Sequence, residues 1–132
     1  VGITGDAGAA YSIMEFETLG KYRIPAIMIV YNNNAWGVWT SGAGRGAVRA
    51  QHMYLFQENL RYEKIAEALG CNGEYVTSPE QMIPALERAY KLASDEGIST
   101  LINCQGKKEF WTNEYPPSMP RHFAPGALAY YK

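Results

Sequence analysis

The 132-residue chain has few of the features that mark a secreted, membrane-bound or nucleic-acid-binding protein. Its two cysteines, Cys71 and Cys104, form no Cys-x-x-Cys pattern, so buried free thiols are expected rather than a metal site or an essential disulfide. No apolar run approaches the length of a membrane span, and no basic-then-apolar signal opens the chain. A net charge of -1 gives no reason to expect nucleic acid or an anionic membrane as partner. These features favour a cytoplasmic catalytic domain.

Short apolar runs alternate with helical periodicity and predict an α/β fold. The expected architecture is a doubly wound parallel sheet with helices on both faces. Ser78, Pro79 and Gln81 combine a helix N-cap, a proline at the first helical position and a glutamine three residues after the cap. We expect strands at residues 1–4, 26–31, 74–76 and 99–104, and helices at residues 9–23, 60–69 and 78–94.

The apolar positions of these helices predict which faces are buried. In the helix at 60–69 the inward residues are Ile65, Ala66 and Leu69; in the helix at 78–94 they are Met82, Ala85, Leu86, Ala89 and Leu92. The helix at 9–23 carries a wider stripe of Ile13, Met14, Phe16, Leu19 and Tyr22. That width suggests a contact beyond the sheet, so we expect a homo-oligomer, a dimer or tetramer, with this region at or near a subunit interface.

Two polar clusters follow consecutive predicted strands. Asp6 lies in the turn at residues 5–8, after the first strand, and an asparagine run at 32–34 follows the second. In a right-handed strand-helix-strand unit both strand ends lie at one edge of the sheet, so Asp6 and Asn33 can converge there. The same edge presents the first N–H groups of the helix, from Ala7 onward. A carboxylate, an amide oxygen and a helix N-terminus together suit a divalent cation that holds a phosphate.

Each cluster taken alone has a simpler explanation. Asp6 by itself is as typical of a helix N-cap, and an asparagine run is typical of a turn. The pair at this spacing, between a strand and a helix of suitable length, favours the cofactor site. The glycine cluster at 42–46 lacks the Lys-Ser/Thr ending of a phosphate loop, so we expect a mobile loop, in which Arg45 or Arg49 could face an anionic ligand.

The turn Gly-Asp-Ala, followed after about 25 residues by Asn-Asn, resembles the cofactor motif of thiamine diphosphate (ThDP) enzymes. That motif usually reads Gly-Asp-Gly and has Gly-Asp-Ala in acetolactate synthases. The segments at 11–13, 15–19, 24–25 and 33–37 look especially like benzaldehyde lyase and the branch of 2-hydroxyacyl-CoA lyase and oxalyl-CoA decarboxylase. The resemblance covers residues 1 to about 105 and is strongest over 1–39.

The resemblance assigns roles to individual residues. Asp6 and Asn33 would be side-chain ligands of Mg²⁺, with the backbone carbonyl of Ala35 as a third ligand. The other cofactor contacts it implies are the diphosphate-binding residues Gly5, Ala7, Gly8, Gly37 and Val38. Catalytic residues stay unassigned, with Trp36 and His122 as candidates; Trp36 is also explained as a core residue, and a lone histidine such as His122 is more often a packing residue. Tyr31 and Trp39 adjoin the cofactor loop and are also explained as core residues. His52 is a further candidate of the same kind as His122, and Arg121 could supply a phosphate contact from a lid.

The family resemblance also implies what must come from elsewhere. Enzymes of this superfamily need a glutamate against the aminopyrimidine of ThDP, and it comes from another domain, usually of a partner subunit. Nothing in this chain corresponds to it, nor to the apolar residue that bends the cofactor. The chain therefore resembles a diphosphate-binding domain that lacks its first strand and helix, and we expect it to be inactive alone.

The implied reaction is the cleavage or formation of a carbon–carbon bond. A lyase, decarboxylase or carboligase acting on a 2-hydroxyacyl-CoA or a 2-hydroxyketone is favoured. An acetolactate-synthase-like enzyme acting on pyruvate is the alternative, because of the Gly-Asp-Ala variant. A third hypothesis is a non-catalytic assembly module with the same fold. The presence of both Asp6 and Asn33 argues against it.

Composition changes after Gln105, which divides the chain into a cofactor-binding region at 1–105 and a tail at 106–132. The tail interleaves aromatic residues with four prolines: Phe110, Trp111, Tyr115, Pro116, Pro117, Pro120, Phe123, Pro125, Tyr130 and Tyr131. These aromatic residues show no helical or strand periodicity, so we expect them to pack against another surface. The tail is either a docking arm on a neighbouring domain or subunit, or a lid over the substrate.

Overall fold

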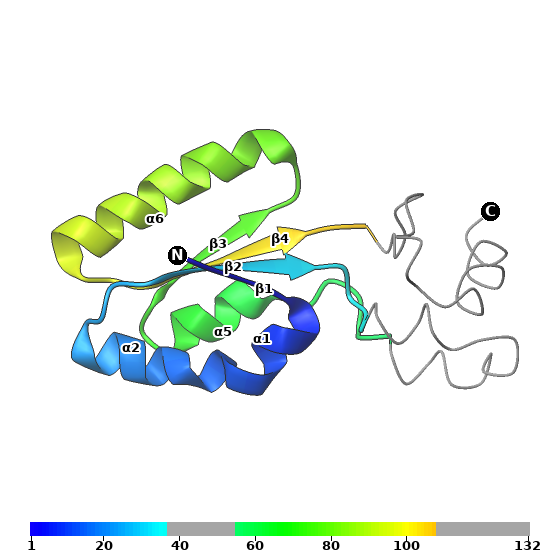
Figure 1. Cartoon of the computed structure of the whole chain (residues 1–132), viewed down its shortest axis with the longest axis horizontal. Coiled ribbons are helices and arrows are strands. Elements are labelled where there is room, and N and C mark those ends of the chain that lie inside the picture. Colours follow the sequence, from blue (N-terminus) through cyan, green and yellow to red (C-terminus); the bar gives the residue numbers. More distant parts are fainter. Residues whose placement is uncertain (37–54, 108–132) are drawn as a thin grey trace, which may run out of the picture.

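The computed structural model describes residues 1–36 and 55–107, and these form a four-stranded, wholly parallel sheet (Figure 1). Its order is β1-β2-β4-β3. The strands are β1 (Gly2–Gly5), β2 (Ile27–Asn32), β3 (Asn72–Val76) and β4 (Thr100–Gln105). Parallel neighbours require crossover connections, which carry the helices to the faces of the sheet.

Helices cover both faces, which confirms the predicted doubly wound α/β fold (Figure 1). One face carries α1 (Asp6–Ser12), a 3₁₀ turn η1 (Ile13–Glu15), α2 (Phe16–Tyr22) and α5 (Tyr62–Ala68). The other face carries α6 (Met82–Glu96), which the 3₁₀ turn η2 (Pro79–Gln81) precedes. None of the helices in these described ranges is both long and apolar enough to cross a bilayer.

Each face of the sheet has its own apolar core. The core under α1, α2 and α5 contains Ala9, Ile13, Phe16, Val30, Tyr62, Ala66 and Leu101. The core under α6 contains Ile27, Val76, Ala85, Ala89 and Ile102. Residues from β2 and β4 contribute to both cores because successive side chains of a strand point to opposite faces. Both faces of these two central strands are therefore covered, in keeping with the apolar runs Ile27–Val30 of β2 and Leu101–Ile102 of β4.

The helix predicted at 9–23 differs from the observed structure in two ways. It begins earlier, at Asp6, and it is interrupted at Ile13–Glu15. Ser12 has φ -138° and ψ 8°, outside the helical region, so the helix cannot run through it. Ile13 and Phe16, three positions apart, both belong to the core.

The burial predicted for Ile65 is wrong, because this residue is 38% exposed. The helix α5 instead buries Tyr62, Glu63 and Ala66. Glu63 takes the inward position because its carboxylate has a partner on β4, Asn103. An argument from apolar periodicity assigns every glutamate to the surface. It therefore predicts that the wrong face of α5 is buried.

The capping prediction for α6 is confirmed. Ser78 and Gln81 form a complete capping box, with Pro79 at the start of the helical segment. Ala85 and Ala89 are buried, and Met82 and Leu86 pack against the same core. The helix then ends at Gly97, whose φ of 66° is the left-handed conformation that glycine adopts most readily.

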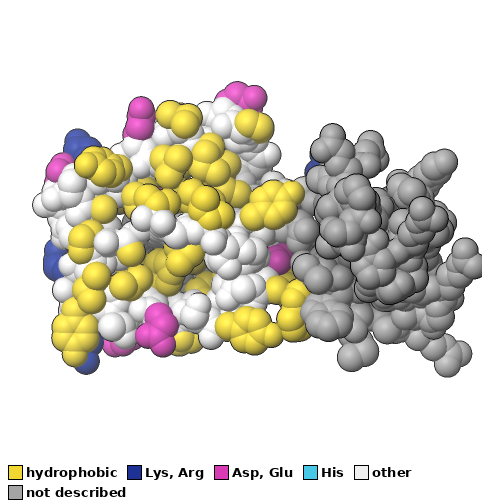
Figure 2. Space-filling view, viewed as in Figure 1, with side chains coloured by type: hydrophobic (Ala, Val, Ile, Leu, Met, Phe, Trp, Pro, Cys, Tyr) yellow, Lys and Arg dark blue, Asp and Glu magenta, His cyan; other side chains and the backbone are white. Residues whose placement is uncertain are grey.

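Apolar side chains are also exposed on the outside of the fold (Figure 2). β1 is an edge strand, and its Ile3 is largely exposed. Of the stripe predicted to reach beyond the sheet, Ile13 and Phe16 belong to the core, whereas Met14 and Tyr22 are exposed. These two residues and Tyr11 are the exposed large apolar residues of the helical segment.

Candidate functional site

Asp6 lies at the carboxyl end of β1, where the strand passes directly into α1. The residue is 2% exposed. One carboxylate oxygen, Oδ1, accepts a hydrogen bond from the N–H of Ala7 at 2.8 Å, and the other, Oδ2, accepts one from the N–H of Ala35 at 3.1 Å. Burial raises the pKa of the Asp6 carboxyl above its usual value, and these backbone N–H groups oppose that rise.

The asparagine run forms the turn that meets Asp6. The side-chain oxygen of Asn33 accepts a hydrogen bond from the N–H of Ala35 at 3.2 Å, and Asn34 adopts a left-handed conformation with φ 57°. Ala35 thus donates the same N–H to the Asn33 carboxamide and to the Asp6 carboxylate. The structure therefore brings together the two side chains that the sequence places at one edge of the sheet.

The polar groups at this edge fit a cation. Within residues 1–36 and 55–107 no lysine or arginine forms an ion pair with Asp6, although its carboxylate is buried. The side-chain oxygen of Asn34 is also buried and accepts no hydrogen bond in that part of the chain. A buried carboxylate is costly unless something offsets its charge, and a bound cation would do so.

The oxygen donors favour a hard cation over a transition metal. The described residues contain no cluster of three or more His, Cys, Asp or Glu side chains that could hold a metal. One carboxylate combined with amide and carbonyl oxygens instead suits Mg²⁺, which takes oxygen ligands and commonly keeps substrate phosphates in its coordination sphere.

Gly5 immediately precedes Asp6, and the space around its α-carbon is open. A Cβ atom built on Gly5 would meet no atom of the described residues within 4 Å. Its φ of -82° and ψ of 168° are extended and available to any residue, so the backbone conformation does not require glycine there. At Gly8, by contrast, a Cβ would collide with the Thr4 side chain. A side chain at Gly5 would therefore be accommodated by the described part of the protein itself.

The remaining predicted site residues are only partly described. Trp36 packs edge to face against Tyr11, with ring centroids 6.2 Å apart, and Tyr31 is half exposed. Predicted cofactor contacts Gly37 and Val38 lie outside the described residues. So do the candidates Trp39, Arg45, Arg49, His52, Arg121 and His122, together with the tail beyond residue 107. The roles assigned to all of these stay predictions.

Several buried polar residues behind the turn were not predicted. Asn32, Glu63 and Asn103 are all buried and joined by hydrogen bonds. The pKa of Tyr62, next to Glu63, is raised by burial and then by the negative charge of Asp6. Asn103 could have indicated this network, because it is an amide inside the otherwise apolar run Leu101–Cys104. A polar residue in a buried strand needs a hydrogen-bond partner.

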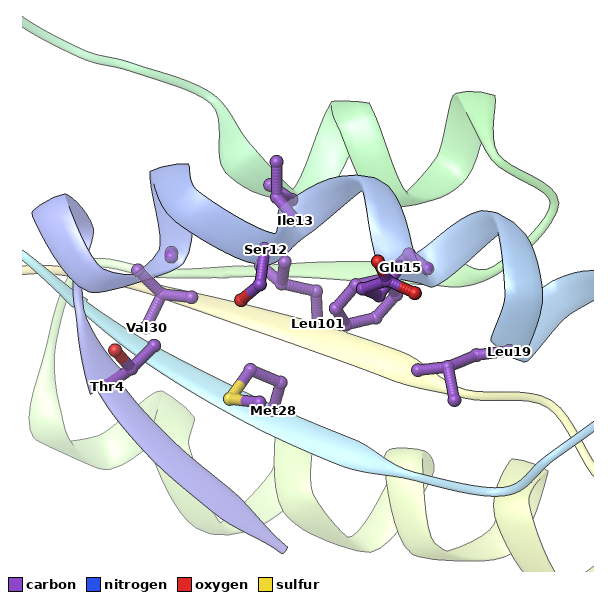
Figure 3. A pocket seen from close by; sticks show the side chains of 10 residues that line it. Thr4, Ser12, Ile13, Glu15, Leu19, Met28, Val30 and Leu101 are labelled. Carbon is purple, nitrogen blue, oxygen red and sulfur yellow. The ribbon is translucent and has the colours of Figure 1, made fainter.

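A separate apolar cavity of about 160 Å³ lies between the sheet and the helices α1 and α2 (Figure 3). Figure 3 shows Ile13 of the helical segment above Val30 and Leu101 of the strands, with Leu19 to the right of Met28. Ser12 and Glu15 are among the few polar residues that line it. Its lining contains neither Asp6 nor Asn33, so this cavity is distinct from the oxygen cluster at the carboxyl edge.

These features define a doubly wound α/β domain with an oxygen-rich site at the carboxyl ends of its first two described strands. The family model of the thiamine pyrophosphate enzyme, C-terminal TPP binding domain, matches residues 1–104. The chain therefore belongs to this family of ThDP-binding domains. ThDP and thiamine pyrophosphate (TPP) are two names for one cofactor.

The chain is similar to several characterised enzymes of this family. A 2-hydroxyacyl-CoA lyase of Oryza sativa is 32% identical over 110 residues, 78% of this chain and 18% of that protein. An oxalyl-CoA decarboxylase of Escherichia coli is 32% identical over 107 residues, again 78% of this chain and 18% of the relative. An acetolactate synthase large subunit of Mycobacterium tuberculosis is 30% identical over 105 residues, 76% of this chain and 18% of the relative.

A solved structure confirms the fold. The ThDP-dependent 4-hydroxybenzoylformate decarboxylase of Rhodococcus jostii superimposes with a TM-score of 0.64 at 22% sequence identity, covering 80% of this chain and 19% of that one. The chain thus spans less than a fifth of the length of each of these relatives. Those relatives include lyase, decarboxylase and synthase activities.

Proposed function

We propose that this chain is the diphosphate-binding part of a ThDP- and Mg²⁺-dependent enzyme that breaks or forms carbon–carbon bonds. One observation carries the proposal: the Asp6 carboxylate and the Asn33 carboxamide accept hydrogen bonds from a single N–H at the carboxyl edge of a parallel sheet. Ligands of doubly wound folds bind at this edge. The family membership of residues 1–104 supplies the identity of the cofactor.

Asp6 and Asn33 would hold Mg²⁺ through side-chain oxygens, and Ala35 through its carbonyl. The cation would neutralise the cofactor's diphosphate, which would otherwise face a buried carboxylate. Gly5, Ala7 and Gly8 would line the diphosphate, with Gly37 and Val38 on its other side. When bound, ThDP supplies nucleophilic addition to a substrate carbonyl, which allows an adjacent carbon–carbon bond to break or form. This chain's own residues bind and orient the cofactor for that chemistry.

The substrate that we favour is a 2-hydroxyacyl-CoA or a 2-hydroxyketone. The similarity to a 2-hydroxyacyl-CoA lyase and an oxalyl-CoA decarboxylase supports a lyase, decarboxylase or carboligase. The alternative is an acetolactate-synthase-like reaction on pyruvate, which the Gly-Asp-Ala sequence and the similarity to an acetolactate synthase support. A cytoplasmic location is proposed for either enzyme.

The remaining parts of the enzyme would complete the site. The glutamate that contacts the aminopyrimidine of ThDP would come from another domain, so the chain by itself would be inactive. We further propose a homo-oligomer whose interface includes the exposed residues Tyr11, Met14 and Tyr22 of the segment from α1 to α2. The tail at 106–132 would act as a docking arm or as a lid over the substrate.

Assays of the full-length polypeptide with ThDP and Mg²⁺ can distinguish these activities. Cleavage of a 2-hydroxyacyl-CoA or 2-hydroxyketone, with formation of an aldehyde, would support the favoured function. Release of CO₂ from pyruvate with formation of acetolactate would support the alternative. Tight binding of ThDP without turnover of any of these substrates would contradict both and favour a non-catalytic assembly module.

A further inference from the structure

Asn32, the last residue of β2, is fully buried, and both polar atoms of its side chain are used. Its Oδ1 accepts a hydrogen bond from the N–H of Asn34 at 3.1 Å, and its Nδ2 donates one to the carbonyl of Leu60 at 2.9 Å. The reverse orientation of the amide would place an oxygen against the Leu60 carbonyl and an NH₂ group against the Asn34 N–H. Both hydrogen bonds therefore fix the same orientation of the carboxamide.

The bond to Asn34 controls the turn that meets Asp6. Asn34 sits in the left-handed region, which a non-glycine residue occupies at some cost. The side chain of Asn32 holds the N–H of Asn34, and the side chain of Asn33 holds the N–H of Ala35. Side-chain bonds to an N–H two residues later stabilise such turns. Two such hydrogen bonds in succession hold the N–H groups of Asn34 and Ala35 and so fix the backbone of the turn.

The bond to Leu60 connects this turn to the rest of the fold. The Leu60 carbonyl also accepts a hydrogen bond from Asn103 Nδ2 at 3.0 Å, and the same Nδ2 lies 2.7 Å from a carboxylate oxygen of Glu63. Glu63 is 1% exposed and is ion-paired with Arg61. The Arg61 guanidinium in turn lies 4.0 Å from the centre of the Tyr75 ring on β3.

The backbone of Asn32 is held as well as its side chain. Its carbonyl accepts hydrogen bonds from the N–H of Gly106 at 2.7 Å and from Gln105 Nε2 at 3.1 Å. These hydrogen bonds are partly buried, so the loss of one partner leaves the other less well satisfied. The position of Asn32 is therefore determined by β4 and by the segment that leads into α5.

We infer that Asn32 is a positioning residue, which holds the turn of Asn33 and Ala35 against Asp6 without touching the ligand itself. This inference rests on the proposed function, because it concerns the ligands of the proposed Mg²⁺ site. Asn103 shares the Leu60 anchor but has no hydrogen bond to the turn. Comparing variants of Asn32 and Asn103 therefore distinguishes an effect on the position of the site from an effect on the stability of the fold.

The test uses the full-length polypeptide with Asn32→Ala, Asn32→Ser and Asn103→Ala. For each variant, the Mg²⁺ concentration that gives half-maximal ThDP binding is measured by titration calorimetry, and the melting temperature is measured without ligand. Serine can still accept from an N–H two residues later but cannot reach Leu60, so it keeps only the contact with the turn.

Asn32→Ala should raise the half-maximal Mg²⁺ concentration by about tenfold or more, a loss of about 1.4 kcal/mol. Asn32→Ser and Asn103→Ala should raise it by less than about threefold, although both lower the melting temperature. The inference is overturned if Asn103→Ala or Asn32→Ser raises the Mg²⁺ requirement as much as Asn32→Ala does, or if Asn32→Ala leaves it unchanged.

Asp6→Ala, measured in parallel, separates this inference from the proposed function. An unchanged Mg²⁺ requirement in Asp6→Ala would contradict the proposed metal site itself. An increased requirement in Asp6→Ala combined with an unchanged one in Asn32→Ala would overturn only the positioning role. If Asn32→Ala does not fold, a large increase in Asn32→Ser still overturns the inference, because serine retains the contact with the turn.

Discussion

The space at Gly5 gives a sharp test of where the cofactor lies. Replacing Gly5 by alanine adds a methyl group that meets no atom of residues 1–36 and 55–107 within 4 Å, at an extended backbone conformation that alanine adopts freely. Alanine lowers the conformational entropy of the unfolded chain relative to glycine, which would stabilise the folded protein by about 0.4 to 1 kcal/mol. Alanine is a poorer N-cap than glycine, which costs a similar amount. The free energy of unfolding without ligand should therefore change by less than about 0.5 kcal/mol.

Binding of the cofactor should respond very differently. If the diphosphate occupies this space, the added methyl group displaces it or its cation, and the Kd for ThDP should rise by about tenfold or more, equivalent to about 1.4 kcal/mol. Titration calorimetry at saturating Mg²⁺ gives the Kd, and urea unfolding of the ligand-free protein gives the free energy.

Gly73→Ala is the matched control, because it makes the same chemical change elsewhere. A Cβ on Gly73 would lie 2.5 Å from the backbone carbonyl oxygen of Glu63, so β3 and α5 would have to separate. This variant should lose about 1 to 3 kcal/mol of stability and keep its affinity for ThDP. Our reasoning about Gly5 would be refuted if Gly5→Ala destabilised the ligand-free protein as much as Gly73→Ala, or bound ThDP as tightly as the unmodified protein.

Two further predictions concern the fold away from the site. Ser78→Ala removes half of the capping box at the start of α6 and should lower the free energy of unfolding by about 1 kcal/mol, measured by urea denaturation; an unchanged midpoint would show that the capping bonds contribute nothing. Burial raises the pKa of the Cys71 and Cys104 thiols, so their reactive thiolate forms only at higher pH than in a free cysteine. At about pH 8 both should react with iodoacetamide more slowly than glutathione does, as followed by peptide mass spectrometry, and alkylation at the rate of glutathione would contradict this.

The sequence predicted the parts of the fold that depend on local pattern. Apolar runs located the four strands to within one or two residues, and the cap at Ser78 marked the start of a helix that the structure confirms. The topology of a strand-helix-strand unit then sufficed to bring Asp6 and Asn33 together, because parallel strands end at one edge. Their role as metal ligands stays a prediction.

Features that depend on distant partners could not be predicted in this way. Glu63 and Asn103 bond across 40 positions, and Asn32 and Leu60 across 28, so no local pattern shows that these polar residues are buried. The exposed position of Ile65 follows from the same network, since the buried glutamate sets the rotation of α5. The interruption at Ser12 was also missed, since no proline lies between Ala9 and Arg23 to mark it.

The central claim is that Asp6 and Asn33 hold the cation that binds the cofactor's diphosphate. The most direct test measures ThDP binding to the full-length protein over a series of Mg²⁺ concentrations, for Asp6→Ala, Asn33→Ala and the exposed-site control Asp95→Ala. We predict that Asp6→Ala and Asn33→Ala each weaken Mg²⁺-dependent binding by about tenfold or more while the fold stays intact, and that Asp95→Ala has no effect. Unchanged affinity in both site variants would contradict the account.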